Sequence, residues 1–422
     1  MAALDAHELP GLSLVVLQGD SALLMRGYGH AGLAREEAIS ETTVFQLGSI
    51  SKQFLAVLVL ALAEDGKLSV DDPVTRHLPQ FALLSPDVRI RHLLNHTSGL
   101  RELFTLPEAQ SAFDDLSRSR DELEAAVRRA PVDFDAGSRW SYSNTNYTIL
   151  ALLVERVTGQ PYEQALSNRF FKPLGLHSLR QCTPLPLDRT EAQGHEKLKG
   201  VVVTAAPENM NWIRGDGGLC GSALDVARWT RLLAAGKVVT PRSYRLMTAP
   251  TLLLPGSRQA DYGFGLSLVN PDGQRKVAHN GAMRGFSASA AYYPDAALTV
   301  VVLANRGDVR TESIERAVAR HLLGVKHPPL GERLLAADEY RRFLGTYDIG
   351  VFKVRVVDRK GQLWLEMPRP GPTTQLSYLG NCRFAGKADP DAYELTFSGG
   401  PEAAQEVRLL MGAMHWYGVR VQ

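Results

Sequence analysis

The stretch GSISKQFLAVLVLALAEDG, residues 48–66, decides how the rest of the chain is interpreted. Its apolar residues surround a helix on nearly all sides, and such a helix lies buried in the centre of a protein. Gly66 is a typical residue just beyond a helix end. The unbroken apolar run at 54–63 is about half of the ~20 residues that a membrane span needs. The stretch therefore predicts a buried central helix and no transmembrane span.

Strand patterns lie on both sides of this helix in the sequence. The runs at 12–17 and 22–29 predict an N-terminal β-hairpin, and further strand patterns occupy 262–305 before an amphipathic helix at 311–324. Between them, helical patterns are found at about 106–130, 145–158 and 223–236. This segregation predicts an α+β fold: one antiparallel sheet, closed by both chain ends, with flanking helices and a helical region beside it.

The pattern changes after KHPPLGER (326–333), a Pro-Gly and charged interruption that is typical of a linker. Beyond it, about eight short strands rich in aromatic and β-branched residues are separated by turns, which predicts a small closed all-β barrel. We therefore expect a first domain at 1–325, a linker at 326–333 and a barrel domain at 334–422.

Composition excludes several classes of protein. The 422 residues carry 47 Lys and Arg against 45 Asp and Glu without a long basic run, so no nucleic-acid partner is predicted. GYGHAG (27–32) formally matches a dinucleotide fingerprint, but no helix follows it, so no nucleotide cofactor is predicted. Cys182, Cys220 and Cys382 are odd in number and far apart, which predicts free thiols rather than disulfides or a zinc site.

The N-terminus, MAALDAHELPGLS, lacks the charged and apolar regions of a signal peptide. As written, the sequence predicts a soluble, cytoplasmic protein. A periplasmic or secreted protein is the alternative if an N-terminal signal has been trimmed.

A serine and a lysine lie three residues apart at the start of the central helix. Residues at this spacing share one face of a helix, so the Lys52 amine can reach the Ser49 hydroxyl. The positive helix N-terminus and a nearby cation favour an alkoxide, and Lys52 could act as a base if burial partly neutralises it. The alternative is an ordinary N-cap serine beside a solvated lysine.

A second candidate lies in SRWSYSNTNY (138–147), a polar turn before a helix. Tyr142 and Asn144 lie two apart, so both side chains can point into one cleft. A neighbouring lysine is expected to lower the pKa of the Tyr142 phenol, which could then relay a proton to and from Ser49. Asn144 would hold a substrate carbonyl. The alternative is a turn tyrosine that packs its ring.

A third candidate, KVAHNGAMRGF (276–286), contains His279 at a strand end, where it could donate to a substrate carbonyl or carboxylate. Gly281 would let a bound backbone approach closely. A structural histidine is the alternative. His92 and His96 lie four apart, but they lack the glutamate of a zinc-binding HExxH helix and are interpreted as structural.

Taken together and in this order, the three segments resemble the motifs of the penicillin-recognising serine hydrolases: Ser49-Ile50-Ser51-Lys52, Tyr142-Ser143-Asn144 and His279-Asn280-Gly281. The connecting phrases LLNHTSGL (93–100), AGSRWSYSNTNY (136–147), GGLCGSALDVARW (217–229) and VVLANRG (301–307) also look like that family. The resemblance covers about residues 8–324. It is closest to the peptidase S12 branch of class C β-lactamases, D-aminopeptidases, D-Ala-D-Ala carboxypeptidases and related esterases.

The resemblance implies a β-lactamase/transpeptidase-like fold with the site between the sheet and the helical region. It implies that Ser49 is the acylated nucleophile and that Lys52 and Tyr142 share general acid and base duty. Substrate positioning and the oxyanion hole would fall to Asn144, His279, Asn280, Gly281 and Ala282, with the backbone N–H groups of Ser49 and Ala282 as the oxyanion donors. The trailing β-domain looks like the lipocalin-like barrels appended to some D-aminopeptidases and related hydrolases.

The third motif departs from the Lys-Thr-Gly of most β-lactamases. A lysine would hold a β-lactam carboxylate by its full charge, whereas His279 is mostly neutral at pH 7. The departure makes strong β-lactamase activity doubtful and favours the peptidase and amidase branches of the family, where His-x-Gly occurs.

We therefore predict a serine hydrolase without metal or cofactor that acts on a small amide or peptide, with D-residue compounds as the first candidates. A β-lactamase or carboxylesterase is the alternative. A non-catalytic binding protein is an alternative of another class, although such a protein would be expected to lose Lys52 or Tyr142. The substrate is thus a small amide, peptide, ester or β-lactam, and the oligomeric state is left open.

Overall fold

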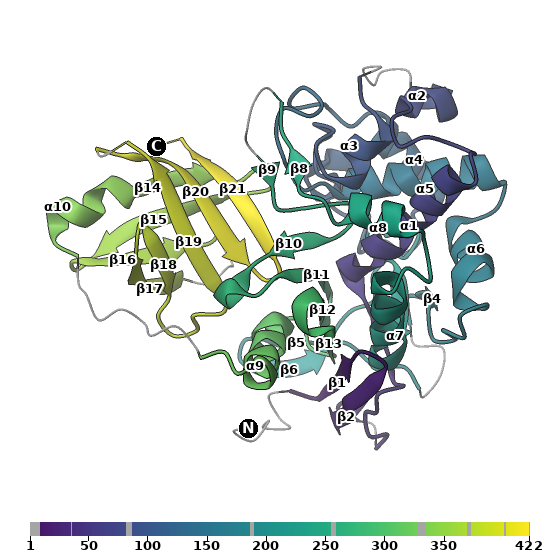
Figure 1. The fold of residues 1–422 in the computed structure, drawn as a ribbon, viewed down its shortest axis with the longest axis horizontal. Helices are drawn as coiled ribbons and strands as arrows, with labels where there is room; N and C mark the ends of the chain where they lie inside the picture. The colour runs from purple at the N-terminus through teal and green to yellow at the C-terminus, as the bar shows by residue number, and fades with distance from the viewer. Residues whose placement is uncertain are drawn as a thin grey trace.

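The structure, a computed structural model, describes residues 9–34, 36–81, 87–185, 190–254, 259–326, 335–368, 373–400 and 402–421. Figure 1 shows a part built of helices and a sheet, which contains most of the chain, and a strand-rich C-terminal part coloured yellow-green to yellow. The linker predicted at 326–333 lies, except for its first residue, outside the described residues. The exact limits of the two domains therefore stay a prediction.

The predicted antiparallel sheet is present, and both ends of the first part build it. In spatial order its strands are β10 (Ser267–Val269), β11 (Lys276–Met283), β12 (Phe286–Tyr293), β13 (Leu298–Ala304), β1 (Gly11–Gln18) and β2 (Ser21–Gly29). The N-terminal hairpin joins the sheet through β1, whose Val15 lies opposite Val301 of β13. Helices α1 (Ser51–Glu64) and α7 (Ala223–Ala234) pack on one face and α9 (Thr311–Leu323) on the other, so β1 and β13 are buried on both faces.

Helix α1 runs through the middle of this part, as its sequence predicts, and every residue from Ser51 to Leu62 is buried. The other helices of the region are α2 (Val74–His77), α3 (Ile90–Leu94), α5 (Asn144–Thr158), α6 (Tyr162–Leu166) and α8 (Pro241–Met247). None of the described helices is both long and apolar enough to cross a membrane. Two small strand pairs lie outside the main sheet: β5 (His195–Leu198) with β6 (Val201–Thr204), and β8 (Thr251–Leu252) with β9 (Gln259–Ala260).

The helix expected at about 106–130 is much shorter in the structure. Only α4 (Arg120–Arg128) is α-helical, and short 3-10 turns precede it. Ser119 sets its start, because its hydroxyl accepts from the Glu122 backbone N–H while the Glu122 carboxylate accepts from the Ser119 N–H. This capping box ends the helix at its N-terminal side and overrides the longer apolar pattern.

The C-terminal part is a closed antiparallel barrel, as predicted. Its eight strands are β14 (Gly345–Asp348), β15 (Lys353–Arg359), β16 (Gln362–Glu366), β17 (Thr373–Gly380), β18 (Arg383–Gly386), β19 (Tyr393–Gly399), β20 (Ala404–Met411) and β21 (Met414–Arg420), and α10 (Ala337–Tyr340) precedes them. Pairing of β14 with β21 closes it. Buried residues alternate along the strands, and Phe343, Phe384 and Phe397 pack against one another with ring centroids 5.0–5.6 Å apart.

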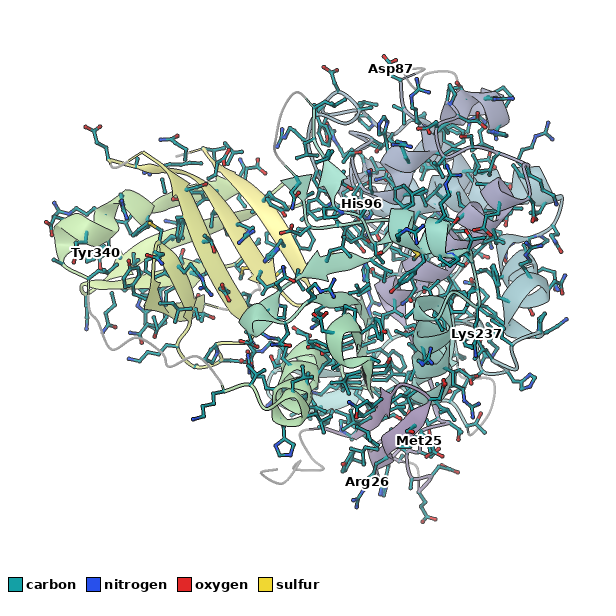
Figure 2. All side chains as sticks on the ribbon, in the orientation of Figure 1. Met25, Arg26, Asp87, His96, Lys237 and Tyr340 are labelled. Atoms are coloured by element: carbon teal, nitrogen blue, oxygen red, sulfur yellow. A yellow bond between two sulfur atoms is a disulfide. The ribbon has the colours of Figure 1, made fainter. Side chains whose placement is uncertain are left out.

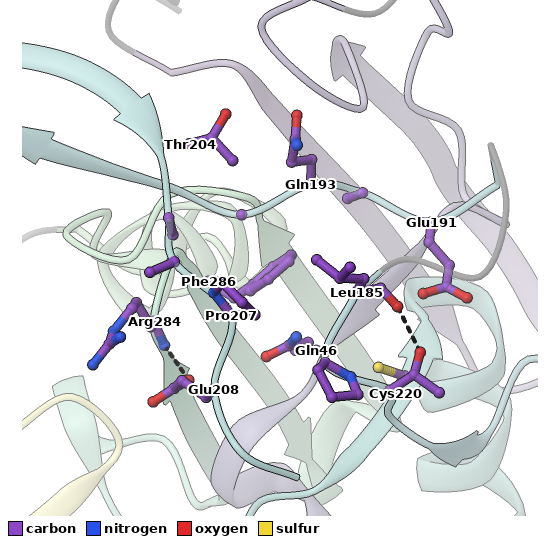
Figure 3. A pocket seen from close by; sticks show the side chains of 16 residues that line it. Gln46, Leu185, Glu191, Gln193, Thr204, Pro207, Glu208, Cys220, Arg284 and Phe286 are labelled. Carbon is purple, nitrogen blue, oxygen red and sulfur yellow. Dashed lines mark hydrogen bonds between the residues drawn. The ribbon is translucent and has the colours of Figure 1, made fainter. Parts of the chain in front are cut away.

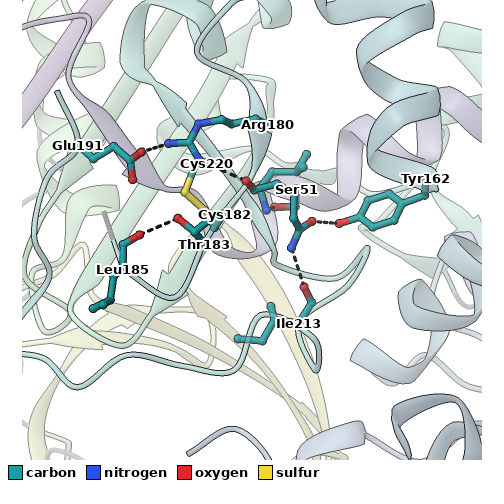
Figure 4. The surroundings of a disulfide bond; sticks show 11 residues. Ser51, Tyr162, Arg180, Cys182, Thr183, Leu185, Glu191, Ile213 and Cys220 are labelled. Atoms are coloured by element: carbon teal, nitrogen blue, oxygen red, sulfur yellow. Dashed lines mark hydrogen bonds and ion pairs between the residues drawn. A yellow bond between two sulfur atoms is a disulfide. The ribbon is translucent and has the colours of Figure 1, made fainter. Parts of the chain in front are cut away.

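The expectation of three free cysteines is wrong for two of them. Cys182 and Cys220 form a disulfide, with Cα atoms 5.1 Å apart (Figure 4). Strand β4 (Arg180–Gln181) pairs with β7 (Leu219–Ser222), which also pairs with β3 (Val44–Gln46), and this pairing places the two cysteines side by side. Their separation of 38 residues hid the pairing from sequence reasoning. Cys382 is not in a disulfide.

Removing this disulfide is expected to lower the free energy of unfolding of the first part. A cross-link that closes a loop of 38 residues constrains the unfolded chain and stabilises the fold by about 2–4 kcal/mol. We expect this loss in the paired variant Cys182→Ala/Cys220→Ala, measured by denaturant unfolding, whereas Cys382→Ala serves as the matched control with a small change. Equal midpoints for the two variants would contradict a stabilising role.

Candidate active site

Ser49 lies in a tight 3-10 turn, η1 (Gly48–Ile50), between β3 and α1. Its side chain does not cap α1, because the N-cap residue is Ile50 and no side-chain cap bond is made. The Ser49 Oγ instead accepts two hydrogen bonds, from Lys52 Nζ at 3.0 Å and from the Tyr142 hydroxyl at 2.9 Å. The structure therefore brings three of the sequence-predicted residues together around one hydroxyl, which is still half exposed.

Lys52 is fully buried rather than solvated. Its Nζ also donates to Asn144 Oδ1 at 2.7 Å and to the Asp216 backbone oxygen at 2.6 Å. Burial lowers the pKa of Lys52 to about 8, because the ammonium loses hydration, although the charges of Asp216 and Glu102 oppose the shift. A substantial fraction of Lys52 is thus neutral in mildly alkaline solution and able to accept a proton.

Tyr142 contradicts the expectation that its pKa is lowered. Burial raises the pKa of the Tyr142 phenol well above its ordinary value, and the negative charges of Glu102 and Asp216 add to the rise, whereas its hydrogen bond to Ser49 opposes it. The Lys52 Nζ lies 4.9 Å from the ring centroid, but desolvation of the phenolate outweighs that neighbour. Tyr142 therefore remains a protonated donor at neutral pH.

Asn144, the first residue of α5, makes its hydrogen bonds to other residues of the protein. Its Oδ1 accepts from Lys52, while its Nδ2 and its backbone N–H donate to the Glu102 carboxylate at 2.8 and 2.6 Å. Glu102 thus fixes which way the amide faces. Sequence reasoning missed both Glu102 and Asp216, since an isolated acidic residue in a loop carries no spacing signal; each lies only beside a family-like phrase, after LLNHTSGL or before GGLCGSALDVARW.

His279, on β11, has no exposed surface. Its Nδ1–H donates to the Asn280 carbonyl oxygen at 2.6 Å, and its Nε2 accepts from the Tyr262 hydroxyl at 2.9 Å. Burial lowers the pKa of His279 to about 3, so the ring is neutral. Both ring nitrogens are therefore occupied, and the ring offers no positive charge to a substrate carboxylate.

The backbone of β11 lies directly against the Ser49 turn, and two glycines make this contact possible. Gly48 has a φ of +52°, and an added Cβ there would lie 2.7 Å from the Ala282 nitrogen. An added Cβ at Gly281 would clash with the Leu47 carbonyl oxygen and lie 3.1 Å from the Ser49 nitrogen. Ala282 is exposed beside the half-exposed Ser49. The two backbone segments that would supply the oxyanion donors according to the family resemblance are thus neighbours.

Residues of the C-terminal barrel also lie next to the site. Trp416 of β21 lies 5.6 Å from the Tyr142 ring and 5.9 Å from the Trp140 ring, measured between ring centroids. An added Cβ at Gly412, in the turn between β20 and β21, would be 3.0 Å from the Asn280 side chain. The second and third motifs therefore both lie against the C-terminal part. The sequence alone did not show whether the barrel lies near the site.

A small cavity of about 60 Å³ lies among β3, the start of β12 and the Cys182–Cys220 disulfide (Figure 3). Gln46 of β3, Phe286 of β12 and Cys220 of the disulfide line it, and the Arg284 backbone N–H donates to Glu208 at 2.9 Å at its edge. Ser49 is not among the residues that line it. This cavity is therefore distinct from the group of side chains that contact the Ser49 hydroxyl.

Several known proteins are similar to this chain. A family model described as Beta-lactamase matches residues 1–324. The chain is similar to Penicillin-binding protein 4* of Bacillus subtilis (strain 168), with 28% identity over 366 residues, 81% of this chain and 80% of that protein. It is also similar to a D-aminopeptidase of Cereibacter sphaeroides (strain ATCC 17029 / ATH 2.4.9), with 30% identity over 315 residues, 74% of this chain and 59% of that protein.

The chain thus spans less than two thirds of that D-aminopeptidase. Among solved structures, the octameric penicillin-binding protein homologue from Pyrococcus abyssi is similar over 97% of this chain and 96% of its own, with a TM-score of 0.68 and 22% identity. This likeness extends over both parts of the chain, and it confirms the fold class predicted from the sequence.

Proposed function

This chain belongs to the Beta-lactamase family, and on that premise we propose that it is a serine hydrolase with Ser49 as the acylated nucleophile. The observation that carries the proposal is the pair of hydrogen bonds on the Ser49 Oγ, one from a buried lysine and one from a buried tyrosine. A hydroxyl held by a base and a proton donor is the arrangement that nucleophilic catalysis needs.

Acylation follows from these contacts. Neutral Lys52 takes the Ser49 proton as Oγ attacks the substrate carbonyl carbon, and the carbonyl oxygen becomes an oxyanion. Tyr142 then donates its proton to the leaving amine and recovers one from the Lys52 ammonium. The carbon–nitrogen bond breaks, and an ester between Ser49 and the acyl group remains. In deacylation, water loses a proton to the same pair as its oxygen attacks the ester carbonyl carbon. The bond between that carbon and Ser49 Oγ then breaks, the Oγ takes the proton back from the pair, and the acid is released.

The oxyanion would be held by the backbone N–H groups of Ser49 and Ala282. Each such donor typically supplies about 3–4 kcal/mol of barrier reduction when it is aimed at the developing charge. The close packing of Gly281 on the Ser49 turn supports this assignment, because it holds the two segments at a constant separation.

We infer that the substrate is a small amide or peptide, with a D-residue preferred. The D-aminopeptidase likeness supports this choice. Strong β-lactamase activity is disfavoured, because the neutral His279 has no free nitrogen and supplies no charge for a β-lactam carboxylate. Asn144 acts in this proposal by fixing Lys52, since both ends of its amide are already bonded.

A panel of chromogenic substrates tests the proposal: D-alanine p-nitroanilide, its L-isomer as the matched control, a p-nitrophenyl ester and a chromogenic cephalosporin. We expect the D-anilide to be cleaved with the highest kcat/KM relative to the intrinsic reactivity of each compound. Dominant ester or cephalosporin cleavage would instead indicate a carboxylesterase or β-lactamase. No release from any of the four by folded protein would contradict a hydrolase and favour a binding protein.

A further inference from the structure

His96, labelled in Figure 2, makes an unusual set of contacts around the proposed proton donor. Its backbone oxygen accepts from the Ser141 N–H at 2.9 Å, and its ring Nδ1 accepts from the Ser143 N–H at 3.1 Å. These are the two chain neighbours of Tyr142. The His96 ring also lies against the Tyr142 ring, with centroids 4.3 Å apart and planes 34° apart. One residue therefore holds Tyr142 from both sides and along its face.

The contacts also specify the protonation state of the ring. The Asn146 Nδ2 lies 3.2 Å from the same Nδ1, and the Ser98 hydroxyl donates to Asn146 Oδ1 at 2.6 Å, so the amide presents its N–H groups to His96. With two donors on Nδ1, the ring proton lies on Nε2. Burial, together with the positive charge of Lys52, lowers the pKa of His96 well below its ordinary value and keeps the ring neutral.

This arrangement carries two local costs. His96 has a φ of +61°, a left-handed conformation that is uncommon for residues other than glycine, although asparagine, aspartate and histidine adopt it more often than the rest. Its Nε2 is buried without a hydrogen-bond partner in the described part of the chain. Strained backbone and unpaired buried groups persist where the surrounding structure holds them, and they cluster at functional sites.

We propose that His96 is a positioning residue that aims the Tyr142 hydroxyl at the Ser49 Oγ. This inference rests on the proposed function, in which that hydroxyl delivers the proton to the leaving group. The Nδ1 acceptor fixes the backbone on the C-terminal side of Tyr142, the carbonyl fixes the N-terminal side, and the ring limits rotation of the phenol. His96 touches neither Ser49 nor the substrate in this role; it acts through Tyr142.

Two variants separate the ring from the acceptor. His96→Asn keeps an acceptor at the position of Nδ1 and tolerates a positive φ, but loses the ring. His96→Phe keeps the ring and loses the acceptor. We expect the Phe variant to lower kcat by roughly 100-fold, with KM within about twofold, because a small displacement of a catalytic group costs about that much. The Asn variant is expected to keep several-fold more of kcat than the Phe variant.

The measurement is kcat per reactive serine on the best substrate of the panel, with reactive sites counted after complete labelling by a fluorophosphonate. Counting sites removes any unfolded fraction from kcat, so a purely structural role would leave kcat unchanged while the unfolding midpoint falls. A Phe variant with wild-type kcat, or an Asn variant as impaired as the Phe variant, would overturn the proposal.

If the Phe variant does not fold, His96→Gln takes its place with the same expected loss, because its longer side chain does not place an acceptor at the position of Nδ1. Wild-type protein without turnover on any substrate would instead overturn the proposed function.

Discussion

Ser49→Ala is expected to reduce kcat by ~10⁵–10⁶-fold, because it removes the atom that forms the acyl intermediate. Lys52 and Tyr142 would remain in place, but the hydroxyl oxygen that both of them contact, and that attacks the substrate, would be missing. Binding should survive, since the backbone donors and the walls of the site are unchanged. The measurement is kcat and KM on the best substrate of the panel, together with inhibitor or product affinity by calorimetry.

Folding must be separated from chemistry in this variant. The Tyr142 hydroxyl loses the acceptor that it has in the structure, so a loss of stability of about 1–2 kcal/mol is expected from an unpaired buried group. Thermal unfolding measures it. Ser117→Ala, at an exposed serine in a loop, is the matched control and should keep wild-type kcat. Turnover by Ser49→Ala at even a hundredth of the wild-type rate would refute the assignment of Ser49.

Lys52→Met is expected to lower kcat by ~10²–10⁴-fold, the usual contribution of a positioned general base. Methionine fills a similar volume but cannot take the Ser49 proton. It also leaves the Asn144 Oδ1 and the Asp216 carbonyl without their shared donor, so a lower unfolding midpoint is expected as well. Lys237→Met, at an exposed lysine labelled in Figure 2, is the control. Equal kcat in the two variants would contradict a base at Lys52.

The pH dependence of wild-type kcat/KM gives the same residue a second test. Lys52 acts as a base only when it is neutral, and its pKa is lowered to about 8, so activity should rise as pH increases through about 8. The charge of Asp216 raises the pKa of Lys52. Asp216→Asn removes that charge and should move the inflection to lower pH. An inflection that moves to higher pH in Asp216→Asn would contradict the assignment of the inflection to Lys52. A wild-type rate that falls as pH rises toward 8 would show that protonated Lys52 is the active form.

Much of the fold could be predicted because local patterns carry it. The apolar run of α1, the hairpin of β1 and β2, and the alternating strands of the barrel each depend on residues close in sequence. The contact between Ser49 and Lys52 is likewise local, since the two residues are three positions apart. By contrast, the long helix expected at 106–130 was wrong, because one capping box at Ser119 outweighed the average pattern of the segment.

The residues that surround and orient the candidate catalytic groups could not be predicted in the same way. Glu102, Asp216 and His96 act on the site from loops that are distant in sequence from most of the groups they contact, and no spacing rule connects them. The disulfide between Cys182 and Cys220 has the same cause, a strand pairing that only the folded chain creates.

The candidate reactive groups can be identified from the amino-acid sequence alone: a serine and lysine on one turn, a tyrosine and asparagine in a second segment, and a histidine and glycine in a third. Their protonation states and hydrogen-bond partners, by contrast, depend on how the whole chain folds. Lys52 has a lowered pKa, Tyr142 has a raised one, and His279 is neutral with both nitrogens bonded. Desolvation depends on everything packed around a group, and in a buried site it outweighs the pairwise attraction that neighbouring motifs suggest.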